Sequence, residues 1–333
     1  MVSNGGMKYR STPSAPARPA GLHPRNRHHG RYDMEALCHA NPALRRHLVR
    51  TPAGEPSIDF SAPASVRELN RALLRHHYGI AHWDIPDGYL CPPVPGRADY
   101  LHGLADLLAA DAGGHIPRGP RLRVLDVGVG ANLIYPLLGQ AEYGWSFVGS
   151  DIAAASLQAA AANVRGNGLD GVIELRRQRN PGQLFKGIIG AGESFSLTLC
   201  NPPFHGSAAQ AAQGSQRKLR NLAGGQRAAA GRSRPALNFG GQANELWCRG
   251  GEAGFLRSMV EESVELADRV LWFSSLVSRA ATLPGLLRQL HQAGAVEVRE
   301  VAMAQGSKCS RFVAWSFLPG ARRRAWLQAL AAG

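Results

Sequence analysis

The chain has 333 residues, and 38 Lys and Arg against 24 Asp and Glu give it a formal net charge of +14. A hydrophobic fraction of 44% can fill a real core, which excludes global disorder. No run of about 18 apolar residues lacks a charge or a breaker, so neither a membrane-spanning helix nor a secretory leader is expected. Five scattered cysteines without a CxxC pair indicate no disulfide framework and no zinc site, and they are typical of a reducing cytoplasm. The positive charge favours a polyanionic partner, nucleic acid first and an anionic membrane surface second.

The composition and apolar spacing of the N-terminal third predict a disordered tail followed by a helical module. Residues 1–20 are rich in Ser, Pro, Ala and Gly without a hydrophobic period, so we expect a disordered tail. Residues 84–97 are rich in proline and are expected to form an ordered connector. Three stretches carry apolar residues at helical spacing, namely 33–50, 64–79 and 100–110. Residues 21–110 are therefore predicted to form a helical, basic module that binds RNA.

From about residue 121 the pattern alternates between strands and helices. The expected strands are Leu122–Val127, Ser146–Ser150, Val172–Arg176, Phe195–Cys200, Val270–Leu276, Val296–Val301 and Arg311–Phe317. The expected helices are Ile152–Arg165, Gly254–Ala267 and Leu283–Ala293. Apolar strands that alternate with helices predict an α/β fold with a parallel sheet, and the last two strands predict an antiparallel hairpin at its edge. We expect this domain to span residues 111–320, with 321–333 as a C-terminal tail.

Two segments contain no acidic residue, namely residues 1–32 and 194–244. The second contains a Gly- and Arg-rich stretch, 206–240, which is expected to be a mobile basic loop. Basic segments of this kind are either solvated surface or contacts to RNA phosphates. The residues expected to contact phosphate are Arg25, Arg27, Arg31, Arg217, Lys218 and Arg220. No metal is expected at the adjacent histidines His28 and His29, because the surrounding arginines would repel a cation.

A buried strand runs into a glycine-rich turn at Asp126-Val127-Gly128-Val129-Gly130. Glycines let the backbone approach a ligand, and the carboxyl end of the first strand is where open α/β sheets bind cofactors. The turn is not G-x-G-x-x-G, because Leu133 stands at the third glycine position, and there is no P-loop lysine. The glycine-rich turn suits binding of S-adenosylmethionine (SAM). The alternative is that it is only a tight structural turn between strand and helix. Asp151 ends the next strand and suits the ribose hydroxyls, with a helix N-cap as the alternative.

The most specific motif, Asn201-Pro202-Pro203-Phe204, ends the fourth strand. The Asn201 side-chain oxygen and the Pro202 carbonyl can together accept both hydrogens of an exocyclic amine. The prolines stiffen the backbone, and Phe204 offers a ring on which a flipped base can stack. We predict that these four residues form the catalytic motif of an N-methyltransferase, the alternative being a rigid turn in the core.

Together these motifs resemble those of class I SAM-dependent N-methyltransferases. A closer resemblance is to the bacterial family of 23S rRNA adenine N6-methyltransferases that modify adenine-1618, which is related to eukaryotic methyltransferase-like RNA m6A enzymes. It covers residues 21 to about 318. The segments that carry it are Gly21–His29, Trp83–Pro86, Cys91–His102, Ile134–Leu137, Asn201–His205, Asn238–Gln242 and Met303–Gly306.

The resemblance implies a Rossmann-like class I fold, SAM as methyl donor and one adenine of 23S rRNA, free or in a pre-ribosomal particle, as substrate. It also implies that Arg97 reaches the SAM carboxylate, a task that suits the bidentate guanidinium. Asp126, Gly128, Gly130 and Asp151 complete the expected cofactor site, and the contact to the SAM adenine stays open. We expect a cytoplasmic monomer. Two alternatives remain, a glutamine N5-methyltransferase of a protein factor and a non-catalytic RNA-binding assembly factor.

Overall fold

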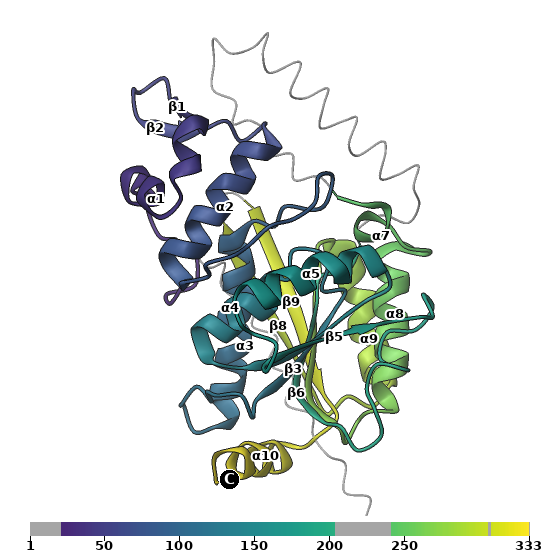
Figure 1. Cartoon of the computed structure of the whole chain (residues 1–333). Coiled ribbons are helices and arrows are strands. Elements are labelled where there is room, and N and C mark those ends of the chain that lie inside the picture. The colour runs from purple at the N-terminus through teal and green to yellow at the C-terminus, as the bar shows by residue number, and fades with distance from the viewer. Residues whose placement is uncertain (1–20, 204–240, 306–307, 333) are drawn as a thin grey trace, which may run out of the picture.

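The computed structural model describes residues 21–203, 241–305 and 308–332. Its centre is a seven-stranded sheet with the order β5-β4-β3-β6-β7-β9-β8 (Figure 1). The strands are β3 Arg123–Val127, β4 Ser146–Asp151, β5 Ile173–Arg177, β6 Phe195–Cys200, β7 Val270–Leu276, β8 Glu297–Gln305 and β9 Lys308–Ser316. The first five run parallel, and β9 pairs antiparallel with both β7 and β8. This confirms the predicted α/β fold and its hairpin edge.

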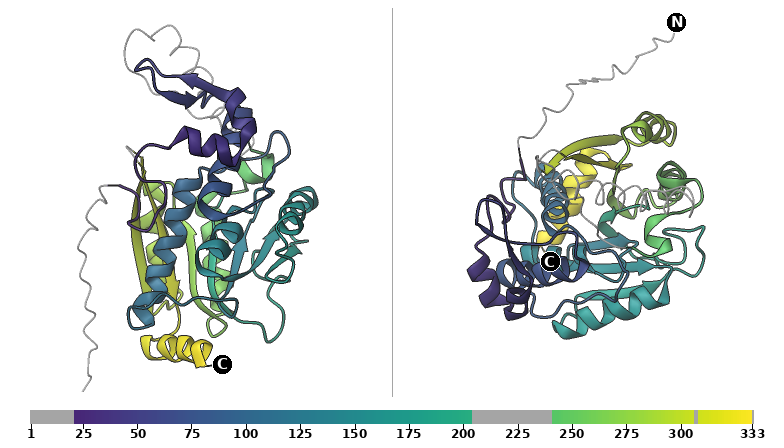
Figure 2. Two further views of the ribbon diagram at one scale, coloured as in Figure 1. Left: turned by 60° about the vertical axis from the view of Figure 1, so that its left-hand side comes forward. Right: turned by 90° about the horizontal axis from the view of Figure 1, so that it is seen from above.

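Helices cover both faces of the sheet (Figures 1 and 2). Alternate residues of a strand point to opposite faces, so Val124 of β3 packs in one core cluster and Leu125 in the other. The helices of the first face are α3 Val94–Asp111, α4 Ile134–Tyr143 and α5 Ala154–Gly166. Those of the second face are α8 Gly251–Val264 and α9 Leu283–Gln292, and a short α7, Ala243–Leu246, precedes them. Residues from both faces reach the carboxyl ends of the parallel strands, where the site described below lies.

The N-terminal part contains α1 Met34–Ala40, the 3-10 helix η1 Pro42–His47, strands β1 Leu48–Arg50 and β2 Pro56–Ile58, and α2 Pro63–Tyr78. The helix predicted over residues 33–50 is wrong in its last part, because β1 pairs antiparallel with β2. A turn closed by the Gly54 N–H and the Thr51 carbonyl, 2.8 Å apart, favours this hairpin. Gly54 has a φ of 80°, which glycine adopts without strain.

Helix α3 begins earlier than expected, inside the stretch predicted as a connector over residues 84–97. Pro95 lies in its first turn, where the missing N–H of proline costs no helical bond. The inner side of α3 joins the same hydrophobic core as α2 and the sheet, with Leu73, Leu104 and Leu197 in one cluster. The N-terminal elements and the sheet therefore share a continuous core.

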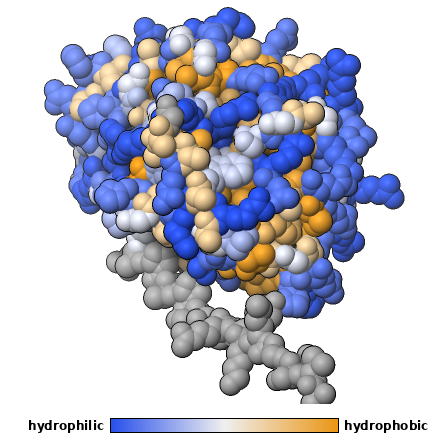
Figure 3. All heavy atoms as spheres, turned by 90° about the horizontal axis from the view of Figure 1, so that it is seen from below, coloured by the Kyte–Doolittle hydropathy of each residue, from blue (hydrophilic) through white to orange (hydrophobic). Residues whose placement is uncertain are grey.

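The segment predicted as a C-terminal tail forms helix α10, Gly320–Ala332. Its Arg323 is 4% exposed and donates from Nε to the Asp111 carboxylate at 2.8 Å. The guanidinium also stacks 4.6 Å from the centre of the Trp272 ring. Figure 3 views the molecule from this end, where hydrophilic side chains surround patches of apolar ones. Across the described ranges, no helix is both long and apolar enough to cross a bilayer.

Candidate active site

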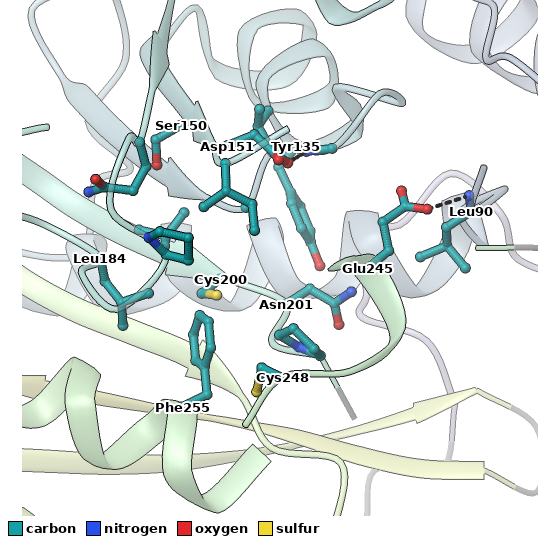
Figure 4. A pocket seen from close by; sticks show the side chains of 18 of the residues that line it. Leu90, Tyr135, Ser150, Asp151, Leu184, Cys200, Asn201, Glu245, Cys248 and Phe255 are labelled. Carbon is teal, nitrogen blue, oxygen red and sulfur yellow. Dashed lines mark hydrogen bonds between the residues drawn. The ribbon is translucent and has the colours of Figure 1, made fainter. Parts of the chain in front are cut away.

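A cavity of about 630 Å³ opens at the carboxyl ends of β3, β4 and β6. Each of the three strands contributes residues just where it ends, because parallel strands bring their carboxyl ends to one edge of a sheet. The lining residues from these ends include Gly128, Asp151 and Asn201. Figure 4 shows Asp151 and Asn201 on opposite sides of the same space, with Glu245 of α7 beside it. The structure thus brings together the three motifs that the sequence singled out.

The glycine-rich turn, which we call the glycine cradle, has a backbone conformation that depends on its glycines. Gly128 and Gly130 have φ values of 77° and 63°, which side-chain-bearing residues rarely adopt. The N–H groups of Gly128 and Val129 both donate to the Ser150 carbonyl at 2.9 Å, which ties β3 to β4. Leu133 also has a positive φ, 52°, at the position where a third glycine would stand, and it is fully buried. A leucine in this conformation is strained, so the surrounding core must hold the turn in place.

Asp151 fixes the shape of that turn. One carboxylate oxygen accepts the Gly130 N–H at 3.0 Å, and the other accepts the Ala153 N–H at 2.8 Å. Burial raises the pKa of the carboxyl above its ordinary value, and the backbone N–H groups of Ala153, Gly130 and Ile152 oppose this effect. Asp151 also lines the cavity. Helix α5 begins at Ala154 with Ala153 as its N-cap and without a side-chain capping bond, so the N-cap interpretation of Asp151 is wrong. Its contact with the ribose hydroxyls stays a prediction.

Replacing Asp151 with alanine is expected to weaken SAM binding by about 1–3 kcal/mol. The variant loses the acceptor for the ribose and leaves the Gly130 N–H without its partner. Calorimetric titration with SAM measures the change. A SAM affinity equal to that of the unaltered protein would contradict the role of Asp151.

Arg97 enters the cavity from the first part of α3. Its Nη1 donates to the Tyr135 hydroxyl at 2.8 Å, and the guanidinium lies 5.6 Å from the centre of that ring. Its Nε is buried and has no hydrogen-bond partner within the described residues. A guanidinium fixed by one bond, with a buried donor unused, can bind a carboxylate.

Asp126 occupies a different place from the one expected. It is 1% exposed, neither carboxylate oxygen has a hydrogen-bond partner among the described residues, and it is not among the residues that line the cavity. Burial raises the pKa of its carboxyl well above the ordinary range, and the nearby charge of Asp151 adds to this, whereas Arg97 opposes it. The direct contact of Asp126 with a cofactor stays a prediction.

Asn201 follows β6 and lines the cavity together with Pro203. Its side-chain Oδ1 is buried without a hydrogen-bond partner within the part of the chain that the structure describes. A buried amide oxygen left unpaired is costly, so such an atom points to a donor supplied by a ligand. Pro202 is buried between them. Phe204, the last residue of the motif, lies outside the described residues.

The connector before α3 forms a wall of the cavity that sequence reasoning missed. Trp83 donates from Nε1 to the Asn132 carbonyl at 2.8 Å, next to the glycine-rich turn. Further along, the Leu90 N–H donates to Glu245 Oε2 at 3.0 Å (Figure 4). This bond joins residues 155 positions apart, so no local sequence pattern could predict it. Trp247, after α7, also lines the cavity.

Gln178, the residue after β5, lines the cavity but uses its amide to shape the following loop. Its Nε2 donates to the Lys186 carbonyl at 2.8 Å, and its Oε1 accepts the Asn180 N–H at 2.9 Å. Leu184 and Pro181 of this loop line the cavity as well. The loop offers an apolar surface there, which suits the flat face of a base.

The N-terminal arginines are engaged within the fold. Arg25 pairs with Asp106 at 2.7 Å, and Arg27 pairs with Glu142 at 2.7 Å. Arg31 pairs with a carboxylate too, but its side chain is 82% exposed. Their contact with RNA phosphate stays a prediction. Arg217, Lys218 and Arg220 lie outside the described residues, as do the whole predicted tail 1–20 and the whole predicted loop 206–240. No group of three metal-ligating side chains occurs within the described residues.

Known proteins share both the fold and the sequence. The human METTL16 catalytic domain in complex with the MAT2A 3′UTR hairpin 1 aligns with a TM-score of 0.75 and 29% identity, covering 90% of this chain and 96% of that one. The N-terminal domain of human METTL16 in complex with SAH aligns with a TM-score of 0.70 and 26% identity. These likenesses and the glycine cradle place the chain among the class I methyltransferases, which use SAM.

A family model described as RNA methyltransferase matches residues 16–319, and the chain belongs to this family. The ribosomal RNA large subunit methyltransferase F of Stutzerimonas stutzeri is 59% identical over 317 residues, 95% of this chain and 96% of that protein. Its counterpart in Cronobacter sakazakii is 56% identical over 312 residues. These findings confirm the family resemblance that the motifs indicate. The protein is a SAM-dependent methyltransferase.

The residues present fit SAM. Among the residues that the structure describes, Arg97 Nε has no partner, which suits the carboxylate of SAM. Gly128 has no Cβ and no described atom close to where one would lie, which suits the amino-acid part. Asp151 stands at the end of the neighbouring strand, where a ribose would lie. The site therefore has a polar end at Arg97 and an apolar end near Leu184.

Proposed function

We propose that the protein transfers the methyl group of SAM to the N6 amine of adenine-1618 in 23S rRNA. This proposal rests on the buried Oδ1 of Asn201 on the wall of the SAM cavity, which has no hydrogen-bond partner in ranges 21–203, 241–305 and 308–332. The names of the bacterial relatives support ribosomal RNA as the substrate. Since side chains cannot read the narrow major groove of A-form RNA, the target adenine is single-stranded or extruded.

In this mechanism, Asn201 Oδ1 accepts one N6 hydrogen and the Pro202 carbonyl accepts the other. The two bonds hold the amine so that its lone pair faces the methyl group. SAM, when bound, supplies an electrophilic methyl on a sulfonium. The neutral amine would form the new N–C bond as the S–C bond to the methyl breaks, with S-adenosylhomocysteine as the leaving group. The methylated amine would then lose its proton to water, so no residue has to act as a strong base. The contribution of Asn201 is thus positioning and charge stabilisation.

The two alternatives fit the observations less well. A glutamine N5-methyltransferase has no use for a net charge of +14. A non-catalytic assembly factor has no need for a buried acceptor on the cavity wall. We therefore retain the rRNA methyltransferase, acting as a monomer in the cytoplasm, on rRNA that is free or in a pre-ribosomal particle.

A methylation assay with purified protein and SAM tests the substrate. Naked 23S rRNA, a pre-ribosomal particle and a bulk protein extract are offered in parallel, and the modified nucleoside is identified by mass spectrometry. N6-methyladenosine in either RNA sample supports the proposal and shows which form is used. Methylglutamine in the protein extract would favour the first alternative, and no product with any substrate would favour the second.

We also propose that exposed arginines around the cavity hold RNA phosphates, together with the basic stretch that contains Arg217, Lys218 and Arg220. Arg249 lines the cavity and is exposed. Arg177 and Arg179 are exposed and flank Gln178 of the cavity wall. Phosphates of an RNA strand that enters the cavity would pass these three side chains.

Replacing Arg177, Arg179 and Arg249 together with alanine is expected to flatten the dependence of RNA binding on salt. Single-strand contacts contribute roughly −0.7 each to the slope of log affinity against log salt, so losing three shifts it by about 2. Filter binding at several salt concentrations measures the slope. A double replacement of Arg322 and Arg324 on α10, at the other end of the molecule (Figure 1), serves as the control. An unchanged slope in the triple variant would assign the RNA contacts to other residues.

A further inference from the structure

Residues 23–26 run along α3 and bond to it repeatedly, and we call them the strap. The Asn26 Nδ2 donates to the Pro95 carbonyl at 2.9 Å and also to the Asp99 carboxylate. The His23 backbone N–H donates to the same carboxylate at 3.0 Å. Figure 2 shows the purple N-terminal segment beside this helix. The strap therefore contacts the first and the second turn of α3.

The contacts continue down the same side of the helix. Arg25 Nη2 donates to the His102 carbonyl at 2.9 Å and to Asp106 at 2.7 Å. The His23 ring pairs with the other oxygen of Asp106 at 2.9 Å. The bonded positions of α3, 95, 99, 102 and 106, are spaced by four, three and four residues, which is one stripe along an α-helix. The strap thus fixes the rotation of α3 about its own axis.

Arg97 lies between the first two of these positions and sends its side chain into the cavity. The beginning of α3 has few other restraints. It has no side-chain cap, its first turn contains Pro95 and Gly96, and the bond from the Arg97 N–H to the Pro93 carbonyl is long, 3.3 Å. The strap bonds therefore make up for a weak helix start at the point where the arginine leaves the backbone.

Asn26 is the central residue of this arrangement. It is 3% exposed and Asp99 is 4% exposed, so their bond is shielded from water. The Asn26 side-chain oxygen also accepts the His28 N–H at 2.9 Å, so all of its polar atoms are paired. A buried, fully bonded amide is expensive to replace and holds its partners in one arrangement.

We infer that Asn26 is a positioning residue that places Arg97 for the carboxylate of SAM. The inference rests on the proposed role of Arg97. Asn26 does not touch the cavity, and it acts by holding Pro95 and Asp99 on either side of the arginine. On this inference the strap supports cofactor binding, whereas the sequence predicts that its Arg25 contacts RNA phosphate.

The test compares two ligands that differ in the group that Arg97 binds. S-adenosylhomocysteine carries the amino-acid carboxylate, and 5′-methylthioadenosine lacks it. In calorimetric titrations, Asn26→Ala is expected to weaken the first ligand about tenfold, the equivalent of one lost hydrogen bond, and to leave the second unchanged. An unaltered affinity for S-adenosylhomocysteine, or an equal loss for both ligands, would overturn the inference, because the second result is what a general loss of structure produces.

Asn41→Ala is the matched control. Asn41 is also buried, and its Nδ2 also donates to a backbone carbonyl and a carboxylate, both of Glu68, but it joins α1 to α2 away from the cavity. It should leave both ligands unaffected. Asn26→Ala in an Arg97→Ala background should cost nothing further, whereas additive losses would contradict action through Arg97.

Asp99 provides a second pair of variants should Asn26→Ala fail to fold. Asp99→Asn keeps an oxygen that accepts both strap bonds and should bind S-adenosylhomocysteine within about twofold of the unaltered protein, whereas Asp99→Ala should lose as much as Asn26→Ala. A greater loss of affinity in Asp99→Asn than in Asp99→Ala would overturn the inference. So would a failure of the unaltered protein to bind S-adenosylhomocysteine. Since binding needs no RNA, a failure to methylate 23S rRNA would refute the proposed function alone.

Discussion

Asn201→Ala is expected to slow methyl transfer by roughly 10²–10⁴-fold while SAM binds with nearly unchanged affinity. The substitution removes the buried oxygen that has no partner within the described residues and would accept the N6 hydrogen. Without it, the amine rotates freely and its lone pair seldom faces the methyl group. Single-turnover kinetics with saturating SAM and RNA measure the rate, and calorimetry measures the cofactor affinity.

The control for this experiment is Asn41→Ala, which removes a buried amide far from the cavity and should retain the rate. Asn201→Asp adds a further check, because the carboxylate keeps the acceptor and should retain more activity than alanine. A rate of Asn201→Ala within a few-fold of the unaltered protein would refute the positioning role.

Arg97→Ala is expected to weaken SAM by about 1–3 kcal/mol, or roughly 5- to 150-fold. The guanidinium is held by the Tyr135 hydroxyl, and its buried Nε has no partner in the described parts of the chain, so its removal eliminates charge-assisted bonds to the carboxylate. It also leaves Asp126 without its neighbouring positive charge, which raises the pKa of that carboxyl further. Calorimetric titration with SAM measures the loss.

Arg97→Lys keeps the charge but not the planar fork, so it should fall between alanine and arginine. Binding of 5′-methylthioadenosine, which has no carboxylate, should be insensitive to both variants. Unaltered SAM affinity in Arg97→Ala would show that the carboxylate binds elsewhere.

The sheet could be predicted from local patterns because each strand is a short apolar run. Phe195–Cys200, for example, is buried along its whole length, as the continuous apolar pattern predicts for a central parallel strand. Residues 48–50 illustrate the opposite case. Their helical spacing was outweighed by pairing with residues 56–58, a contact that depends on a turn and not on periodicity.

The motif residues of the site were predictable because strand order places them at one edge. Gly128, Asp151 and Asn201 each follow a recognisable strand. The contacts of Glu245 and of the strap could not be predicted, because their hydrogen bonds join residues 69 to 155 positions apart. Arg25 is the instructive example. Its charge suggested RNA, but the fold pairs it with Asp106, a partner that composition cannot reveal.

Mass mapping of 23S rRNA from cells with and without the gene is the decisive experiment for methylation of adenine-1618 by this protein. We expect a fragment containing adenine-1618 to lose one methyl group when the gene is deleted. Expression of the intact gene should restore that methyl group, whereas the Asn201→Ala form should not. An unchanged methyl group at adenine-1618 in the deletion strain would contradict the proposed function, and full restoration by Asn201→Ala would contradict the role of Asn201.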